Sequence, residues 1–263
     1  MIAVPREAAT LVLMRDRPGD APEVLMVQRH GQDAFAAGAY VFPGGVLESE
    51  DWSPQALSLC EGLSPESAAA RLSLVEKPER ALGYYLAAIR ETFEEIGILL
   101  VKPRPGAAAP EPGEGALRVG REAVRGGKGA FWGWLRECGL RPAVENLAYF
   151  AHWITPAGRP KRFDTRFFLA PVPSDARPEP DLEEIVDCLW ITPAEAIAAE
   201  RGKRMRMLNA TVKNLEVLAE FASTAEALES LGRCEVPAIL PKLVPQGDGY
   251  RVVLPWEPGY DLV

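Results

Sequence analysis

The stretch that decides the fold is residues 82–97, which read LGYYLAAIRETFEEIG. Its apolar side chains recur at alternating steps of four and three residues, which makes one apolar stripe on an α-helix. The stripe consists of Leu82, Leu86, Ile89, Phe93 and Ile96. Gly97 follows it, at a position where helices commonly end in the left-handed conformation. The stretch therefore predicts a helix packed on a core, and Pro78 suits its first turn.

Three glutamates lie on the other side of this predicted helix. Glu91, Glu94 and Glu95 fall on one turn, so their carboxylates crowd one another. Like-charged pairs at i,i+3 and i,i+4 each cost about 0.2–0.5 kcal/mol, and a helix that needed only solubility would include lysines. Hard oxygen ligands on one turn suit Mg²⁺ or Mn²⁺. The residues alone leave two interpretations open, a divalent-metal site and an acidic solvated face.

Composition limits the class of protein. The chain has 263 residues with 48% hydrophobic content, enough for one large domain or a domain with elaborations. A net charge of −8 argues against a nucleic-acid or membrane-surface binder. The four cysteines lack metal-ligand spacing and indicate reduced thiols. Neither a signal peptide nor an apolar run of about 18 residues is evident, so we expect a cytoplasmic protein.

Apolar runs separated by turn residues predict a mixed α/β chain. Strands are expected at residues 8–14, 23–29, 39–42, 98–101, 147–154, 163–170 and 185–191. Helices are expected at 54–60, 65–72, 119–140, 208–221 and 225–231, with another after the N-cap Thr192. The aromatic residues within 119–140 are expected to pack on the core rather than stack on a base. Residues 239–243 and 250–254 predict a C-terminal hairpin. This order of elements suits an α/β/α sandwich with a mixed sheet.

Two segments resemble the signature of Nudix hydrolases. Residues 90–98, RETFEEIGI, resemble the helical half of the Nudix box, R-E-U-x-E-E-x-G-U, with only Thr92 off pattern. Upstream, residues 42–45, FPGG, resemble the loop that opens the box. The resemblance implies a Nudix-type fold in which Glu91, Glu94, Glu95 and a carbonyl from the loop at Gly45 hold Mg²⁺ or Mn²⁺. Arg90 is expected to fix the carboxylate of Glu91 by a charge-assisted hydrogen bond.

The box is interrupted. The counted acidic position after Gly45 falls on Asp51, and 38 residues then separate Asp51 from Arg90. A subgroup of acyl-CoA diphosphatase-like Nudix proteins has a box split in this way. We therefore predict one Nudix domain over residues 1–263, with a helical insertion at 48–77, a loop-and-helix insertion at 103–145 and C-terminal helices and a hairpin at 203–263. The role of Asp51 is left open.

A coenzyme A motif is partly matched. Arg29, Gly38 and the FPGG loop sit at the intervals found in some Nudix coenzyme A hydrolases, but Ala34 stands where those enzymes have a second arginine. Arg29 has two interpretations, contact with a substrate phosphate or bracing of the glycine loop. The basic residues of the hairpin at 155–166 also have two interpretations, substrate binding or a solvated surface. Arg162 and Arg166 are the residues predicted to contact the substrate.

An acidic loop precedes the predicted strand at 185–191. Nudix enzymes often carry an extra acidic residue in a late loop, acting as base or as a further metal ligand. The resemblance therefore implies a catalytic place for Glu183 or Glu184, and loop solvation is the other interpretation.

The predicted reaction is hydrolysis of a diphosphate linkage in a small nucleoside diphosphate derivative, with no nucleic-acid or membrane partner. The subgroup resemblance implies CoA or acyl-CoA as substrate. Two alternatives stay open: hydrolysis of ADP-ribose or NADH, and a non-catalytic nucleotide-binding regulator. The oligomeric state is also open, with a homodimer through the C-terminal hairpin as one option.

Overall fold

The computed structural model describes residues 3–31, 36–107, 112–127, 129–247 and 249–262. The strands are β1 (Arg6–Arg15), β2 (Glu23–Arg29), β3 (Tyr40–Val41), β4 (Gly44–Val46), β5 (Val101–Pro103), β6 (Leu140–Pro142), β7 (Ala148–Ile154), β8 (Phe163–Pro171), β9 (Ile185–Ile191), β10 (Ala238–Ile239), β11 (Lys242–Gln246) and β12 (Gly249–Val253). The α-helices are α1 (Pro54–Leu57), α2 (Pro65–Leu72), α3 (Pro78–Ile96), α4 (Glu114–Gly126), α5 (Ala130–Glu137), α6 (Pro193–Arg201), α7 (Asn209–Leu218) and α8 (Thr224–Leu231). Short 3₁₀ turns are η1 (Ser49–Trp52), η2 (Val144–Asn146) and η3 (Tyr260–Leu262).

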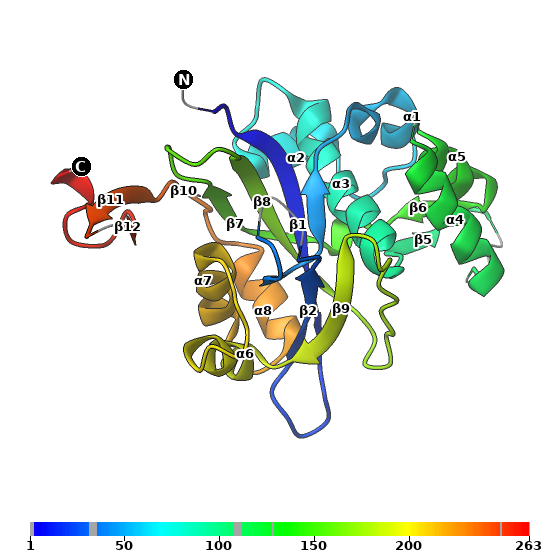
Figure 1. The fold of residues 1–263 in the computed structure, drawn as a ribbon. Coiled ribbons are helices and arrows are strands. Elements are labelled where there is room, and N and C mark those ends of the chain that lie inside the picture. Colours follow the sequence, from blue (N-terminus) through cyan, green and yellow to red (C-terminus); the bar gives the residue numbers. More distant parts are fainter. Residues whose placement is uncertain (1–2, 32–35, 108–111, 128, 248, 263) are drawn as a thin grey trace.

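The main sheet is mixed, as predicted. Its order is β10-β7-β8-β1-β2-β3, with β4 added to β1 and β9 added to β2. β1 runs parallel to β8 and β10 runs parallel to β7, while the other pairs are antiparallel. Figure 1 shows β1 and β2 near the centre of the molecule, between two groups of helices.

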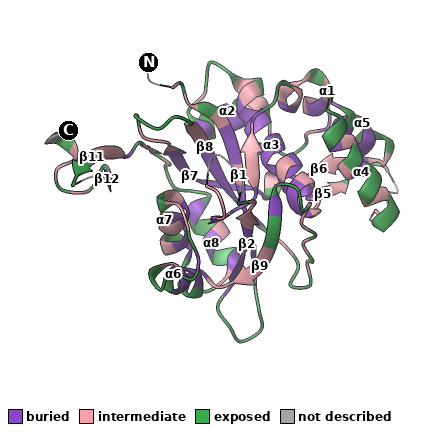
Figure 2. Ribbon diagram, in the orientation of Figure 1, coloured by how far each residue is buried: buried purple, intermediate pink, exposed green. Residues whose placement is uncertain are grey.

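Alternate side chains of β1 enter two different cores. Leu11 and Leu13 belong to the cluster that contains α2, α3 and α5, whereas Val12 and Met14 belong to the cluster that contains α6, α7 and α8. All four side chains are fully buried, as expected of a strand covered on both faces. The predicted α/β/α sandwich is confirmed, and Figure 2 shows the buried residues concentrated in the sheet and α3.

The central helix has the predicted face and end. The five apolar residues of its stripe are all buried. Gly97 adopts φ 71°, and its amide donates to the Phe93 carbonyl over 3.0 Å. The helix begins at Pro78, where proline fits the first turn because that position needs no intrahelical N–H donor.

The strand predicted at residues 98–101 is wrong except at its last residue. β5 begins at Val101 and pairs with β6 in a separate two-stranded ribbon. Leu100 is buried, and its carbonyl accepts from the Ala143 amide over 3.1 Å. The apolar run therefore reflected burial of a connecting segment, which a short apolar sequence does not distinguish from a strand.

The single helix predicted at residues 119–140 is two helices, α4 and α5. Gly127 and Gly129 adopt φ 59° and 73°, values that favour glycine and end α4 before α5 starts. The predicted core packing of the aromatic residues is confirmed. Trp134 is 7% exposed, and its ring stacks on Phe93 of α3 with centroids 5.7 Å apart and planes 6° apart.

The segment predicted as the box insertion contains two helices, and the C-terminal hairpin is present with its first strand three residues later than predicted. α2 has the predicted bounds, and α1 is shorter than predicted. β11 and β12 pair with each other, and Figure 1 shows this hairpin projecting from the body of the molecule. Residue 248 of the predicted turn lies outside the described residues. Among the described residues, no helix is both long and apolar enough to cross a membrane.

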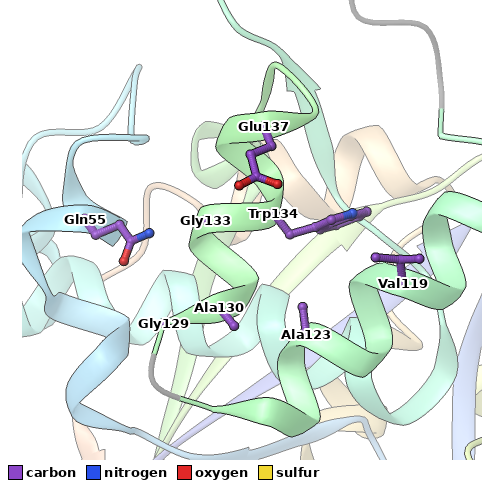
Figure 3. Close-up of a pocket in the computed structure, with 8 residues that line it drawn as sticks. All are labelled: Gln55, Val119, Ala123, Gly129, Ala130, Gly133, Trp134 and Glu137. Atoms are coloured by element: carbon purple, nitrogen blue, oxygen red, sulfur yellow. The ribbon is translucent and has the colours of Figure 1, made fainter.

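A groove of about 420 Å³ lies where α1, α4 and α5 meet, with the Trp134 ring on one wall (Figure 3). The ring packs so closely on α4 that a Cβ atom added to Gly120 would lie 2.6 Å from it. A buried indole on a rigid helix leaves little room to adjust.

We predict that Gly120→Ala lowers the free energy of unfolding by about 1–3 kcal/mol, because the added methyl overpacks the Trp134 contact. The matched control is Gly115→Ala on the same helix, where an added Cβ meets nothing within 4 Å. The control should raise stability by up to about 1 kcal/mol through helix propensity. Urea unfolding of both variants measures the difference, and equal effects would contradict the packing described.

Candidate metal and diphosphate site

The glycine loop lies directly against the acidic turn of α3. β4 pairs antiparallel with β1, with Gly44 opposite Thr10 and Gly45 opposite Ala9. The Gly44 amide donates to Oε2 of Glu95 over 2.9 Å. A Cβ atom added to Gly45 would lie 2.4–2.5 Å from the carboxyl atoms of Glu91. The loop can approach Glu91 this closely only because its second glycine, Gly45, has no side chain.

Arg90 joins the loop, the helix and the segment after the loop. Its Nε and Nη2 donate to the two carboxylate oxygens of Asp51 over 2.8 and 2.9 Å. Its Nη1 donates to Oε1 of Glu91 over 2.9 Å, the hydrogen bond predicted from the sequence. Its Nη2 also donates to the Val46 carbonyl over 3.1 Å, and its Nη1 lies 3.6 Å from Oε2 of Glu94. Arg90 thus holds Glu91 in one orientation.

The contacts of Asp51 show its structural role, which the sequence left open. Its carboxylate is fully buried, and Oδ2 accepts a second hydrogen bond from the Glu48 amide over 2.9 Å. Burial would lower the pKa of Arg90, but the hydrogen bond and charge of Asp51, with the charges of Glu91 and Glu94, outweigh it and raise that pKa. Asp51 and Arg90 therefore form a buried, bidentate ion pair across the insertion.

The acids of the turn differ in exposure. The side chain of Glu95 is 5% exposed, that of Glu91 15% and that of Glu94 29%. Burial raises the pKa of Glu91 to about 7, although Arg90 opposes the shift. Burial also raises the pKa of Glu95 well above its usual value, and the charge of Glu91 adds to the increase. A buried carboxylate whose charge is further disfavoured by a neighbouring carboxylate is a place where a bound cation is stabilising.

The donor chemistry fits a divalent cation of the hard class. Among the described residues, no three His, Cys, Asp or Glu side chains are already gathered as a metal cage. In the structure Glu91 faces Arg90, while Glu95 accepts from the Gly44 amide. The oxygen donors are nevertheless carboxylates of one helical turn beside a residue with no Cβ, and carboxylate oxygen is the donor type that Mg²⁺ and Mn²⁺ require.

Arg29 lies between the turn and the late acidic loop. Its Nη1 is 3.7 Å from Oε1 of Glu95, and its Nη2 is 3.3 Å from Oε2 of Glu184. The structure therefore brings Glu184 to the acidic turn. Glu183 is instead 3.7 Å from Arg125, with a side chain 74% exposed. A catalytic role for Glu183 stays a prediction, and the contacts favour its neighbour.

The two hairpin arginines predicted to bind substrate have other partners. Arg162 donates to the carbonyls of Thr155 and Ala3 over 2.9 and 2.8 Å, so it braces the hairpin and the N-terminal segment. Arg166 is 4% exposed; its Cζ lies 4.3 Å from the Tyr84 ring centroid. These contacts of Arg162 and Arg166 are with groups other than the three glutamates of α3, and the sequence does not reveal that Arg166 is buried. Ala34 lies outside the described residues.

Sequence reasoning missed one residue that contacts this region. Arg121 of α4 donates from Nη2 to the carbonyls of Glu94 and Glu95 over 2.7 and 3.3 Å. No motif marks it, since it lies outside the box in a segment predicted only as a helix with packed aromatics.

We predict that Asp51→Ala lowers the free energy of unfolding by roughly 3–5 kcal/mol, because it leaves the buried Arg90 guanidinium without its bidentate partner. The control is Ser49→Ala, an exposed neighbour for which a change within about 0.5 kcal/mol is expected. Chemical denaturation of both variants is the measurement. A loss for Asp51→Ala no larger than the control would show that the pair does not hold the site together.

Comparison with known proteins agrees with this geometry. Residues 5–215 match the family model described as the NUDT19 Nudix domain. The chain is 30% identical to a human protein named acyl-coenzyme A diphosphatase NUDT19, over 94% of this chain and 74% of that protein. It is also 30% identical to the protein of that name from Gallus gallus, over 97% of this chain and 79% of that one. A Nudix hydrolase structure from Alicyclobacillus acidocaldarius superposes with a TM-score of 0.70 at 26% identity, over 87% of this chain and 97% of that chain. The resemblance inferred from the box is confirmed: this chain belongs to the Nudix hydrolase family, in the group defined by the NUDT19 Nudix domain.

Proposed function

We propose that this chain is a diphosphatase that uses Mg²⁺ or Mn²⁺ to hydrolyse the diphosphate linkage of CoA or acyl-CoA. The observation that carries the proposal is the contact between the glycine loop and the acidic turn, in which Gly44 donates to Glu95 and Gly45 leaves room for Glu91. The names of the two relatives support the choice of substrate. The free state of all four cysteines supports the cytoplasm as its compartment.

The proposed division of labour follows the contacts. Glu91 and Glu95, with the carbonyl of Gly45, would hold the cation, and the more exposed Glu94 would complete the ligands on the solvent side. A divalent cation bound there would neutralise the diphosphate and lower the pKa of the attacking water. Arg90 has the task of keeping Glu91 oriented, because its guanidinium is itself fixed by Asp51.

Hydrolysis needs a group that accepts the proton of the attacking water. The water oxygen forms a bond to one phosphorus, the bridging P–O bond breaks, and the leaving phosphate takes the bridging oxygen. We assign the proton to Glu184, whose carboxylate is 65% exposed and lies beside Arg29 next to Glu95. In this proposal Arg29 would contact a substrate phosphate and also position this glutamate.

We predict that Glu95→Gln lowers kcat at least about 100-fold at saturating Mg²⁺, because it removes a negative ligand from the buried turn, and that Glu94→Gln also loses most turnover. The fold should survive, since burial already disfavours the charge of Glu95. Glu79→Gln, at an exposed position in the first turn of the same helix, is the control and should retain activity. Chelation should abolish wild-type turnover, and Mg²⁺ or Mn²⁺ should restore it. Equal kcat in the wild type, Glu94→Gln and Glu95→Gln would refute the assignment of these residues as metal ligands.

We predict that a panel of CoA, an acyl-CoA, ADP-ribose and NADH gives at least about tenfold higher kcat/KM for the CoA compounds. The products should be 3′,5′-ADP and a phosphopantetheine, identified by mass spectrometry. A preference for ADP-ribose or NADH would overturn the substrate but not the chemistry. Tight binding of one compound without turnover of any would instead indicate a nucleotide-binding regulator.

A further inference from the structure

Arg121 connects α4 to the end of the acidic helix. Its Nη2 donates to the carbonyls of Glu94 and Glu95 over 2.7 and 3.3 Å, and its Nη1 donates to the Glu179 carbonyl over 3.1 Å. Carbonyls in the last turn of a helix lack intrahelical partners, and a cation there also interacts favourably with the helix dipole. One guanidinium thus binds α3 and the loop between β8 and β9 together.

The β8–β9 loop is held against the same end of α3 by its own backbone. The Glu179 amide donates to the Ile96 carbonyl over 2.8 Å, and the Asp181 amide donates to the Glu95 carbonyl over 2.9 Å. The peptide groups at Glu179 are therefore engaged on both sides, by α3 through the amide and by Arg121 through the carbonyl. Displacing Arg121 would free one of these attachments at the point where the loop crosses the helix.

From this point a continuous set of contacts leads to the carboxylate beside Arg29. Oδ1 of Asp181 accepts from the amides of Glu183, Glu184 and Ile185 over 3.1, 3.1 and 3.0 Å. Leu182, inside this turn, has φ 65°, a conformation that costs a residue with a side chain energy and must be maintained by its surroundings. The conformation that presents Glu184 to Arg29 therefore depends on how firmly the loop is attached to α3.

We propose that Arg121 is a positioning residue for the hydrolysis, which fixes the β8–β9 loop on α3 and thereby keeps Glu184 beside Arg29 and the acidic turn. This inference rests on the proposed function. It gives α4 a role in the reaction although none of the proposed metal ligands, Glu91, Glu94, Glu95 and Gly45, belongs to α4. Misplacing a reacting group by about 1 Å can cost roughly 100-fold in rate, so a loss of attachment should appear in kcat.

The chain offers a matched control on the same helix. Arg118 is 76% exposed and pairs with Glu122 at 3.3 Å, one turn along α4. Arg118→Ala removes the same charge from the same helix without touching α3 or the loop. Arg121→Lys keeps the charge, but a single ammonium cannot reproduce the two-sided contact of the guanidinium.

The experiment measures kcat and KM for CoA at saturating Mg²⁺ in wild type, Arg121→Ala, Arg121→Lys and Arg118→Ala. We expect Arg121→Ala to lower kcat about 10- to 100-fold while KM changes less than about threefold. Arg121→Lys should recover part of the loss, and Arg118→Ala should match wild type. Glu184→Gln should also lower kcat, and the double variant with Arg121→Ala should lose less than the product of the two single effects, because both act on one group.

Hydrogen–deuterium exchange supplies a readout that does not depend on turnover. Amides at residues 179–185 should exchange faster in Arg121→Ala than in wild type or Arg118→Ala, while amides of β1 and β8 keep their protection. The positioning role would be overturned if Arg121→Ala had the kcat of the wild type. It would also be overturned if the double variant lost the full product of the two single losses in kcat. Either result would leave the proposed function intact. If amides at residues 179–185 exchanged at the same rate in Arg121→Ala and wild type, the positioning role would be overturned. A wild type that hydrolysed none of the tested compounds would refute the proposed function, and the exchange result would still be decisive for Arg121.

Discussion

The site depends on the hydrogen bonds of one guanidinium. Arg90 is nine-tenths buried, and its donors reach the carboxylates of Asp51 and Glu91 and the carbonyl of Val46. These partners come from three different segments, so the arginine fixes the glycine loop, the acidic helix and the start of the insertion relative to one another. Breaking a buried ion pair by removing one partner is strongly destabilising, because the desolvated charge that remains has lost its compensation. The chain can therefore carry a large insertion within the box without separating its two halves.

The parts of the fold that the sequence predicted are those where side-chain periodicity and burial coincide. The helix α3 was predicted from its apolar periodicity, and the strands β1, β2, β7, β8 and β9 were predicted from apolar or alternating runs bounded by turn residues. The strand predicted at residues 98–101 was wrong because a continuous apolar run indicates that a segment is buried, but not that it pairs with another strand. The helix predicted at 119–140 failed because two glycines with positive φ interrupt it, and a glycine inside a helical pattern does not by itself indicate a break.

In the site, the local contacts could be predicted and the long-range ones could not. The bond from Arg90 to Glu91 follows from adjacency in the sequence, whereas the pair with Asp51 spans 38 intervening residues and depends on how the insertion folds. The choice between Glu183 and Glu184 depends on the turn formed by Asp181, since neighbouring residues of equal chemistry point in different directions. The same limit applies to Arg166, where a basic residue in a hairpin proved to be buried against an aromatic ring.

The central claim is that the acids of α3 and the glycine loop share one divalent cation. The most direct measurement is an anomalous diffraction map from crystals of this protein soaked in Mn²⁺. The account predicts a peak about 2.1 Å from carboxylate oxygens of both Glu91 and Glu95 and close to the Gly45 carbonyl. A map with no peak at this turn at saturating Mn²⁺, or with Mn²⁺ bound only elsewhere on the protein, would contradict it.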